Sequence, residues 1–121
     1  MVVDSSVWLE LANSGKLAES CESRLNKVSQ IFIPTIVFFE IYKKVKKIQT
    51  EQDALEIIGA LSRFTVLDFT RDVSLLAGDL SLEYHLSMAD SIVLAHAKIL
   101  KTSLLTLDHD FQDIPDVIVI H

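Results

Sequence analysis

The chain has 121 residues, half of them hydrophobic, with only three Gly and two Pro. This length accommodates one domain over residues 1–121 but not two viable cores, and the composition excludes a disordered or low-complexity protein. The net charge of −6 argues against binding nucleic acid by charge alone; it fits a general enzyme, or a nuclease whose carboxylates are neutralised by cations.

Short apolar runs alternate along the chain with longer segments of helical periodicity. We expect strands at residues 1–4, 30–33, 64–67, 103–106 and 117–120. We expect helices near residues 6–12, 17–28, 35–48, 51–62, 73–84 and 88–100. The strands are brief and nearly all apolar, as in a parallel sheet that is covered on both faces. The alternation predicts an α/β fold with a parallel sheet.

No part of the sequence predicts export or insertion into a membrane. The first four residues lack the basic start and long apolar core of a signal peptide. No apolar run approaches the roughly 20 residues that span a bilayer. Cys21 is the only cysteine, so it has no partner for an internal disulfide or a zinc finger. A cytoplasmic protein is expected.

Four acidic residues follow or begin elements that should meet at one edge of the sheet. Sites in open α/β sheets form beyond the carboxyl ends of the strands. Asp4 ends the first expected strand, and Asp108 lies just beyond the fourth. Glu40 falls in the helix after the second strand, and Asp90 opens the helix that leads into the fourth. All four carboxylates can therefore reach the same edge.

Each of these acids also has an ordinary structural interpretation. Asp4 could cap the helix that follows it. Glu40 could pair with Lys44 four residues later, which is worth about 0.3–0.5 kcal/mol. Asp90 stands at the third helical position of a capping box that Ser87 begins.

The end of the fourth expected strand offers a hydroxyl, and the segment after it offers two acids. Asp108 and Asp110 are both common turn formers. Asp108 is nearer the strand end and is the preferred site residue, with Asp110 in reserve. Thr106 places a hydroxyl beside the same position.

The conjunction of the four acids points to a bound metal, because no basic residue lies among them. Two carboxylates about 4 Å apart repel by about 4 kcal/mol at an effective dielectric constant of 20. Ligands that are all oxygen favour Mg²⁺ or Mn²⁺ over zinc. Such a metal with open water positions is suited to hydrolysing phosphodiester bonds. The sequence therefore predicts a metal-dependent nuclease.

Four segments carry a resemblance to a known family. They are VVDSSVWL at residues 2–9, IPTIVFFE at 33–40, SMADSIVLAHA at 87–97 and LTLDHDF at 105–111. In this order and over this length, they make the chain resemble a PIN domain, and within that family the VapC toxins of toxin–antitoxin pairs. The resemblance implies a three-layer sandwich around a central five-stranded parallel sheet.

The resemblance also implies an activity and the residues that carry it. The family's four acids correspond to Asp4, Glu40, Asp90 and Asp108, which would hold Mg²⁺ or Mn²⁺, and its polar helper corresponds to Thr106. It implies an endoribonuclease that acts as a homodimer and is inhibited by a small cognate antitoxin.

Other residues could contact the RNA. Lys43 and Lys44 belong to the only basic cluster, which extends to Lys47 and is either a solvated helix face or a phosphate-binding surface. Ser5 and His109 neighbour the predicted metal ligands and could also contact substrate.

Three alternative functions stay open. One is a phosphate-handling α/β enzyme or receiver that uses an aspartate at a strand end as nucleophile or phosphoacceptor. Such folds pair that Asp with a Lys near a later strand end, and the fourth and fifth strand ends lack one. The others are a non-catalytic interaction domain and a PIN nuclease of RNA processing outside toxin–antitoxin systems.

Overall fold

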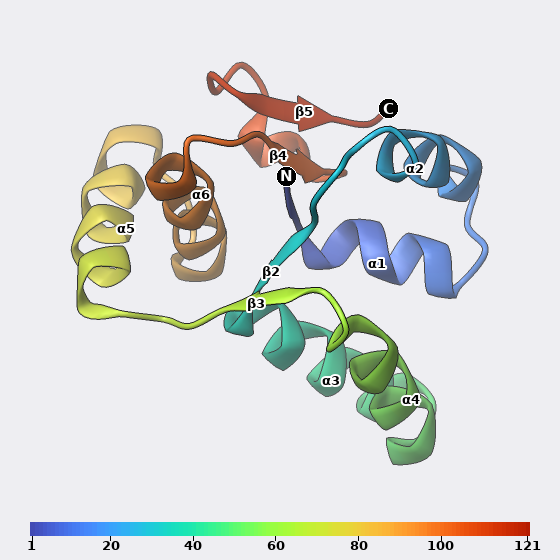
Figure 1. Cartoon of the computed structure of the whole chain (residues 1–121). Helices are drawn as coiled ribbons and strands as arrows, with labels where there is room; N and C mark the ends of the chain where they lie inside the picture. The colour runs from blue at the N-terminus through green and yellow to red at the C-terminus, as the bar shows by residue number, and fades with distance from the viewer.

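Five short strands form one sheet in which every neighbouring pair is parallel (Figure 1). The computed structural model describes residues 1–121, and the strand order is β3-β2-β1-β4-β5. The expected α/β class and five-stranded parallel sheet are confirmed. The strands are β1 (Val2–Val3), β2 (Phe32–Pro34), β3 (Thr65–Leu67), β4 (Leu104–Thr106) and β5 (Val117–Val119).

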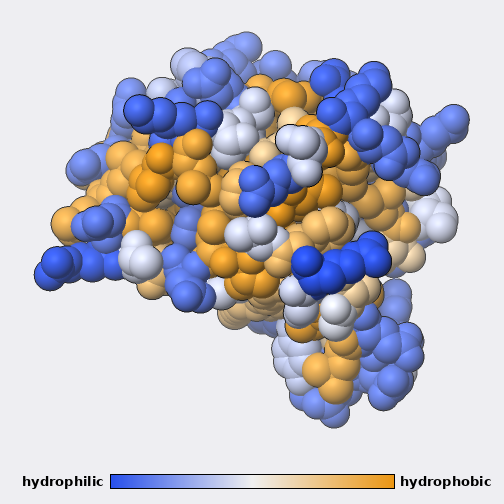
Figure 2. Space-filling model, viewed as in Figure 1, coloured by the Kyte–Doolittle hydropathy of each residue, from blue (hydrophilic) through white to orange (hydrophobic).

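Six α-helices and one 3₁₀ helix connect the strands, close to the positions that the periodicity predicts. In Figure 1, α5 and α6 lie on one side of the sheet, and α1 and α2 lie on the other. Helices α3 and α4 pack on each other as a hairpin that projects from the rest of the molecule (Figures 1 and 2). None of the helices is long and apolar enough to cross a membrane. The helices are α1 (Ser5–Ala12), α2 (Ala18–Leu25), α3 (Thr35–Ile48), α4 (Glu51–Leu61), α5 (Arg71–Tyr84), α6 (Met88–Leu100) and η1 (His109–Phe111).

Helix capping explains where several helices begin. The Thr70 hydroxyl accepts a hydrogen bond from the Val73 N–H, so α5 begins at Arg71, two residues before the expected start. The Ser87 hydroxyl accepts from the Asp90 N–H, which confirms Ser87 as the N-cap of α6. Helix α2 is shorter than expected and ends at Leu25.

The core lies between the central strands and the helices that cover them. Both residues of β1 and all three of β4 are buried, as are residues 91–97 of α6. Trp8 is also buried and stacks on Phe64 with ring centroids 5.6 Å apart, so it is a core residue. The expectation that every strand would be buried on both faces is wrong for β3, whose Thr65 and Val66 are exposed, because β3 forms an edge of the sheet.

The order of the strands reverses between β1 and β4. From β1 the chain adds β2 and then β3 on one side, and it crosses back through α5 and α6 to place β4 on the other side. Val2 and Val3 of β1 pair with Leu104 and Leu105 of β4. The carboxyl ends of these two strands therefore lie side by side at the switch point, where α/β folds form their sites.

Candidate metal centre

The carboxyl edge of the sheet brings together all four acids that the sequence singled out. Asp4 follows β1, and Asp108 follows β4 after one intervening residue. Glu40 reaches the same place from α3, and Asp90 from the first turn of α6. The four acids lie close enough to interact electrostatically: the charges of Asp4 and Asp108 help to raise the pKa of both Glu40 and Asp90.

Asp4 is the most buried of the four acids, with 4% of its surface exposed. It stands at the N-cap position of α1, but its side chain makes no capping hydrogen bond. Instead, its Oδ2 accepts hydrogen bonds from the Thr106 hydroxyl at 2.8 Å and the Ser6 hydroxyl at 2.9 Å. Burial raises the pKa of Asp4, and these hydroxyls act against that rise. Oδ1 is left as the oxygen that could bind a cation.

Glu40 is held against α1 and has no cationic partner. The Ser5 hydroxyl donates to its Oε1 at 3.3 Å. The two salt bridges of the protein are Lys46–Glu51 and Lys98–Asp116, so the pair between Glu40 and Lys44 that the spacing allowed is not formed. Burial raises the pKa of Glu40, and the neighbouring Asp4 carboxylate raises it further.

Asp90 combines a structural position with an unfavourable charge environment. Its backbone N–H is bonded to Ser87, but its half-buried carboxyl faces the other acids. Burial, followed by the charges of Asp4 and Asp108, raises the pKa of Asp90 to about 7. A carboxyl in this state gains from any cation that binds beside it.

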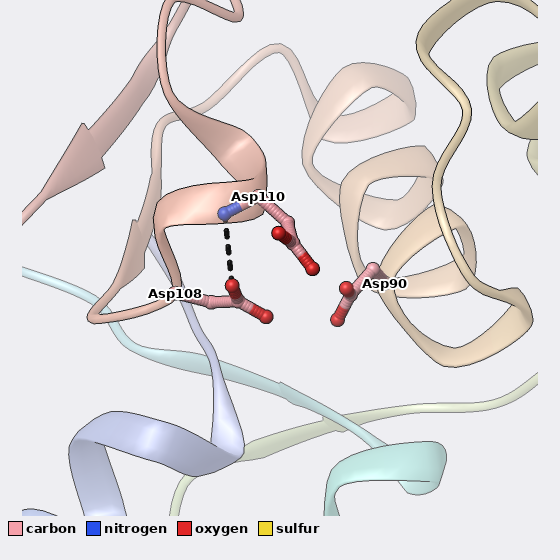
Figure 3. Close-up of side chains that lie close together, drawn as sticks. All are labelled: Asp90, Asp108 and Asp110. Carbon is pink, nitrogen blue, oxygen red and sulfur yellow. Dashed lines mark hydrogen bonds between the residues drawn. The ribbon is translucent and has the colours of Figure 1, made fainter.

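Asp108 and Asp110 both belong to the cluster, although the sequence had to rank one above the other. One carboxylate oxygen from each of Asp90, Asp108 and Asp110 lies within 4.8 Å of the others (Figure 3). Asp108 Oδ1 accepts the Asp110 N–H at 2.9 Å and so begins η1. The Asp108 N–H in turn donates to the Thr106 hydroxyl at 3.0 Å, which ties this loop to Asp4. Asp110 is the more exposed of the two acids.

Ser6 is a residue that the sequence analysis missed. Its hydroxyl contacts the carboxylate of Asp4, lies 3.3 Å from the Thr106 hydroxyl and accepts the Leu107 N–H at 3.0 Å. It therefore joins the loop after β1 to the loop after β4. The only signal in the sequence was its place two residues after Asp4, which also fits an ordinary turn.

The predicted substrate residues lie in a pocket next to the acids. This pocket, of about 520 Å³, lies between α1, α3 and the start of α6, and Lys43, Lys44 and Lys47 line it together with Glu40 and Ser5. Lys46 of the same run points elsewhere, since its ammonium contacts Glu51 at 3.6 Å and the Tyr42 hydroxyl at 3.3 Å. His109 packs against His121, with ring centroids 5.0 Å apart.

The donor set fits a hard divalent cation. It consists of carboxylates and hydroxyls, with no nitrogen or sulfur ligand among its members. Three of the carboxyls have raised pKa values, and no Lys or Arg forms a salt bridge with them. The cluster therefore lacks a positive charge that a metal would supply.

Comparison with known proteins places this fold in one family. The sequence matches the PIN domain over residues 1–117. A toxin–antitoxin complex from Klebsiella pneumoniae contains a chain that is 28% identical, with a TM-score of 0.82 over 98% of this chain and 95% of that one. VapBC2 from Rickettsia felis, crystallised with a DNA fragment from its promoter, is 23% identical with a TM-score of 0.78 over 98% and 96% of the two chains.

A further structural neighbour is a VapC toxin from Mycobacterium tuberculosis that cleaves the sarcin–ricin loop. It is 19% identical, with a TM-score of 0.81 over 96% of this chain and 95% of that chain. No curated protein sequence matches the chain significantly. The match to the family over nearly the whole length, together with the five-stranded parallel sheet, shows that this chain belongs to the PIN-domain family.

Proposed function

We propose that this protein is an endoribonuclease that depends on Mg²⁺ or Mn²⁺ and serves as the toxin of a toxin–antitoxin pair. The observation that carries the proposal is the convergence of Asp4, Glu40, Asp90 and Asp108 at the switch point of the sheet, where none of them forms a salt bridge with a Lys or Arg side chain. The toxin–antitoxin complex and the sarcin–ricin loop cleaving toxin among its structural neighbours support the same assignment.

The acids and hydroxyls have distinct roles in this proposal. Asp4 and Asp90 would bind the principal metal directly, while Glu40 and Asp108 would complete the shell, partly through water or with a second ion. Such a metal would activate a water and stabilise the leaving oxygen of the phosphodiester. The hydroxyls of Thr106 and Ser6 hold the Asp4 carboxylate in one orientation through its Oδ2.

The assembly is proposed on the strength of the neighbours. The solved relatives include VapBC complexes, so a small cognate antitoxin is expected to bind this chain and inhibit it. A homodimer is expected as well, as the family resemblance implies.

The test is cleavage of a labelled RNA by the purified chain. Cleavage should require Mg²⁺ or Mn²⁺, stop on chelation, and give products without a 2′,3′-cyclic phosphate, because water attacks the phosphorus. The same cations should raise the melting temperature by mass action on the folded state. A chain that shows neither cleavage nor a thermal response to either metal would be an interaction domain and not a nuclease.

The lysines that line the pocket beside Glu40 should bind RNA phosphates. Replacing Lys43 and Lys44 with Gln is expected to flatten the log–log salt dependence of RNA binding by up to about 1.4 units, at about 0.7 per phosphate contact to a single strand. The measurement is the affinity of a short RNA across a salt series, with an Asp90→Asn chain that cannot cleave it.

Lys46→Gln is the matched control for this prediction. Lys46 belongs to the same helix but is engaged by Glu51 and Tyr42, so its removal should change the slope much less. Equal slopes for both variants would mean that the run is a solvated helix face.

A further inference from the structure

A second polar pocket opens at the same edge of the sheet, on the other side of the acids. It has a volume of about 550 Å³ and is formed by α2, from Glu19 to Arg24, by Lys16 before that helix and by the residues that end and follow β5. The Ile120 N–H donates to the Thr106 carbonyl at 2.9 Å, which places this segment beside the carboxyl end of β4. His121 of the pocket contacts the ring of His109, the residue after Asp108.

The side chains that line this pocket, which we call the α2 pocket, are suited to an anion. Lys16 and Arg24 are exposed and take part in neither of the two salt bridges of the protein. Ser20 and Ser23 add hydroxyl donors to the lining. Ser20 lies three residues before Ser23 and four before Arg24, so its side chain neighbours both of them on the surface of α2. Glu19 is the one acidic side chain that the pocket contains. Figure 2 shows a largely hydrophilic surface over α2.

The order of the strands places the two basic pockets on opposite sides of the acids. The pocket that Lys43, Lys44 and Lys47 line has these lysines on α3, which follows β2, and the α2 pocket adjoins the end of β5. Asp4 and Asp108 follow β1 and β4, which lie between β2 and β5 in the sheet. With strands about 4.8 Å apart, β2 and β5 are about 14 Å apart, a distance that a few nucleotides can span.

We propose that the α2 pocket binds a backbone phosphate of single-stranded RNA beyond the cleavage site, through Lys16 and Arg24. The proposal rests on the nuclease function proposed above and extends it. An RNA strand laid along the carboxyl edge would meet Lys43 and Lys44, the metal centre, and then Lys16 and Arg24 in turn. Arg and Lys contacts of this kind position a strand without reading its sequence.

The test compares two double variants that remove the same charge from different edges. Lys16→Gln/Arg24→Gln alters the α2 pocket, whereas Lys27→Gln/Lys101→Gln alters two pockets at the amino edge of the strands. Both are made in an Asp90→Asn background and checked for an unchanged melting temperature. Affinity for an RNA of about twelve nucleotides, and for a trinucleotide, is then measured across a salt series.

The variant of the α2 pocket should flatten the salt slope for the longer RNA by up to about 1.4 units and weaken its binding by up to about 25-fold at 0.1 M salt. The control at the amino edge should leave both quantities close to their starting values. Trinucleotide binding should respond less, because its two phosphates cannot occupy both basic pockets and the metal centre together. Equal losses in the two double variants, or none in either, would overturn the proposal.

The nuclease assignment and the pocket can fail separately. In one outcome, RNA binding depends on Lys16 and Arg24 but the unaltered chain never cleaves RNA. This result would refute the nuclease function and support RNA binding by the α2 pocket. In the other outcome, the unaltered chain cleaves RNA with a bound metal but replacing these two residues does not change the salt slope of RNA binding. This result would support the nuclease function and refute RNA binding by the α2 pocket.

Discussion

Replacing Asp90 with Asn is expected to lower metal-dependent RNA cleavage by at least about 100-fold, since residues that only support metal ligands already cost 10- to 100-fold when they are changed. The substitution preserves size but removes one negative charge from the cluster. It should leave the fold intact, because the capping bond of Asp90 is made by its backbone N–H to Ser87. The measurement is the cleavage rate of a labelled RNA at saturating Mn²⁺, with circular dichroism as the check on folding.

The chain offers a closely matched control for this substitution. Asp53 occupies the corresponding position of α4, where its backbone N–H bonds the Thr50 hydroxyl at 3.0 Å, but it lies outside the metal centre. Asp53→Asn should therefore retain the cleavage rate. Full activity in Asp90→Asn would contradict the metal assignment. Asp110→Asn should be milder than Asp108→Asn, and the reverse order would make Asp110 the fourth ligand.

The metal-free protein is expected to become more stable as the pH falls from about 8 to about 5. Burial and the neighbouring acids raise the pKa of Asp90 to about 7, far above the 3.8 of a free side chain. The folded state therefore binds a proton that the unfolded state releases, and stability is lost as the pH rises toward 7. Asp4 and Glu40 have raised pKa values and act in the same direction.

The expected gain in stability follows from the part of the Asp90 pKa shift that lies between pH 5 and pH 7. Two pKa units correspond to at most about 2.7 kcal/mol, and solvent screening of a half-exposed carboxyl reduces this to about 1 kcal/mol. A gain of that size raises the melting temperature by about 3–6 °C. Calorimetric scans in chelator across the pH range measure it.

Two comparisons isolate the cause of this pH dependence. Asp90→Asn should raise the stability of the metal-free protein near pH 8 and flatten its dependence on pH, whereas Asp53→Asn should do neither. Saturating Mn²⁺ should also flatten the dependence, because the metal replaces the bound proton. A melting temperature that falls steadily from pH 8 to pH 5 without metal would contradict the model of a strained acidic cluster.

The local patterns of the sequence were sufficient for the fold class and for the region of the site. Brief apolar runs and helical periodicities predicted the alternating elements, because each pattern is set by residues within a few positions of one another. The Ser87–Asp90 spacing predicted the start of α6 for the same reason. Asp4 and Asp108 could be placed at one edge because parallel strands present their carboxyl ends together.

Tertiary structure alone decided how these residues meet. Ser6 joins the site by contacts with Thr106 and Leu107, which are 100 and 101 residues away in sequence. Lys46 forms a salt bridge with Glu51 and does not line the pocket that the other lysines of the run line. The rise in the pKa of Asp90 depends on burial and on charges from other segments.

The sequence by itself determined which elements form and which acids stand at their ends. It did not determine the exposure of β3, which follows from its place at the sheet edge, or the inclusion of Asp110 beside Asp108. The α2 pocket depends likewise on residues near positions 16–24 meeting those near 119–121. The physical reason is range: helix periodicity and capping act between near neighbours, whereas burial, electrostatic coupling and pocket shape depend on segments that only the folded chain brings together.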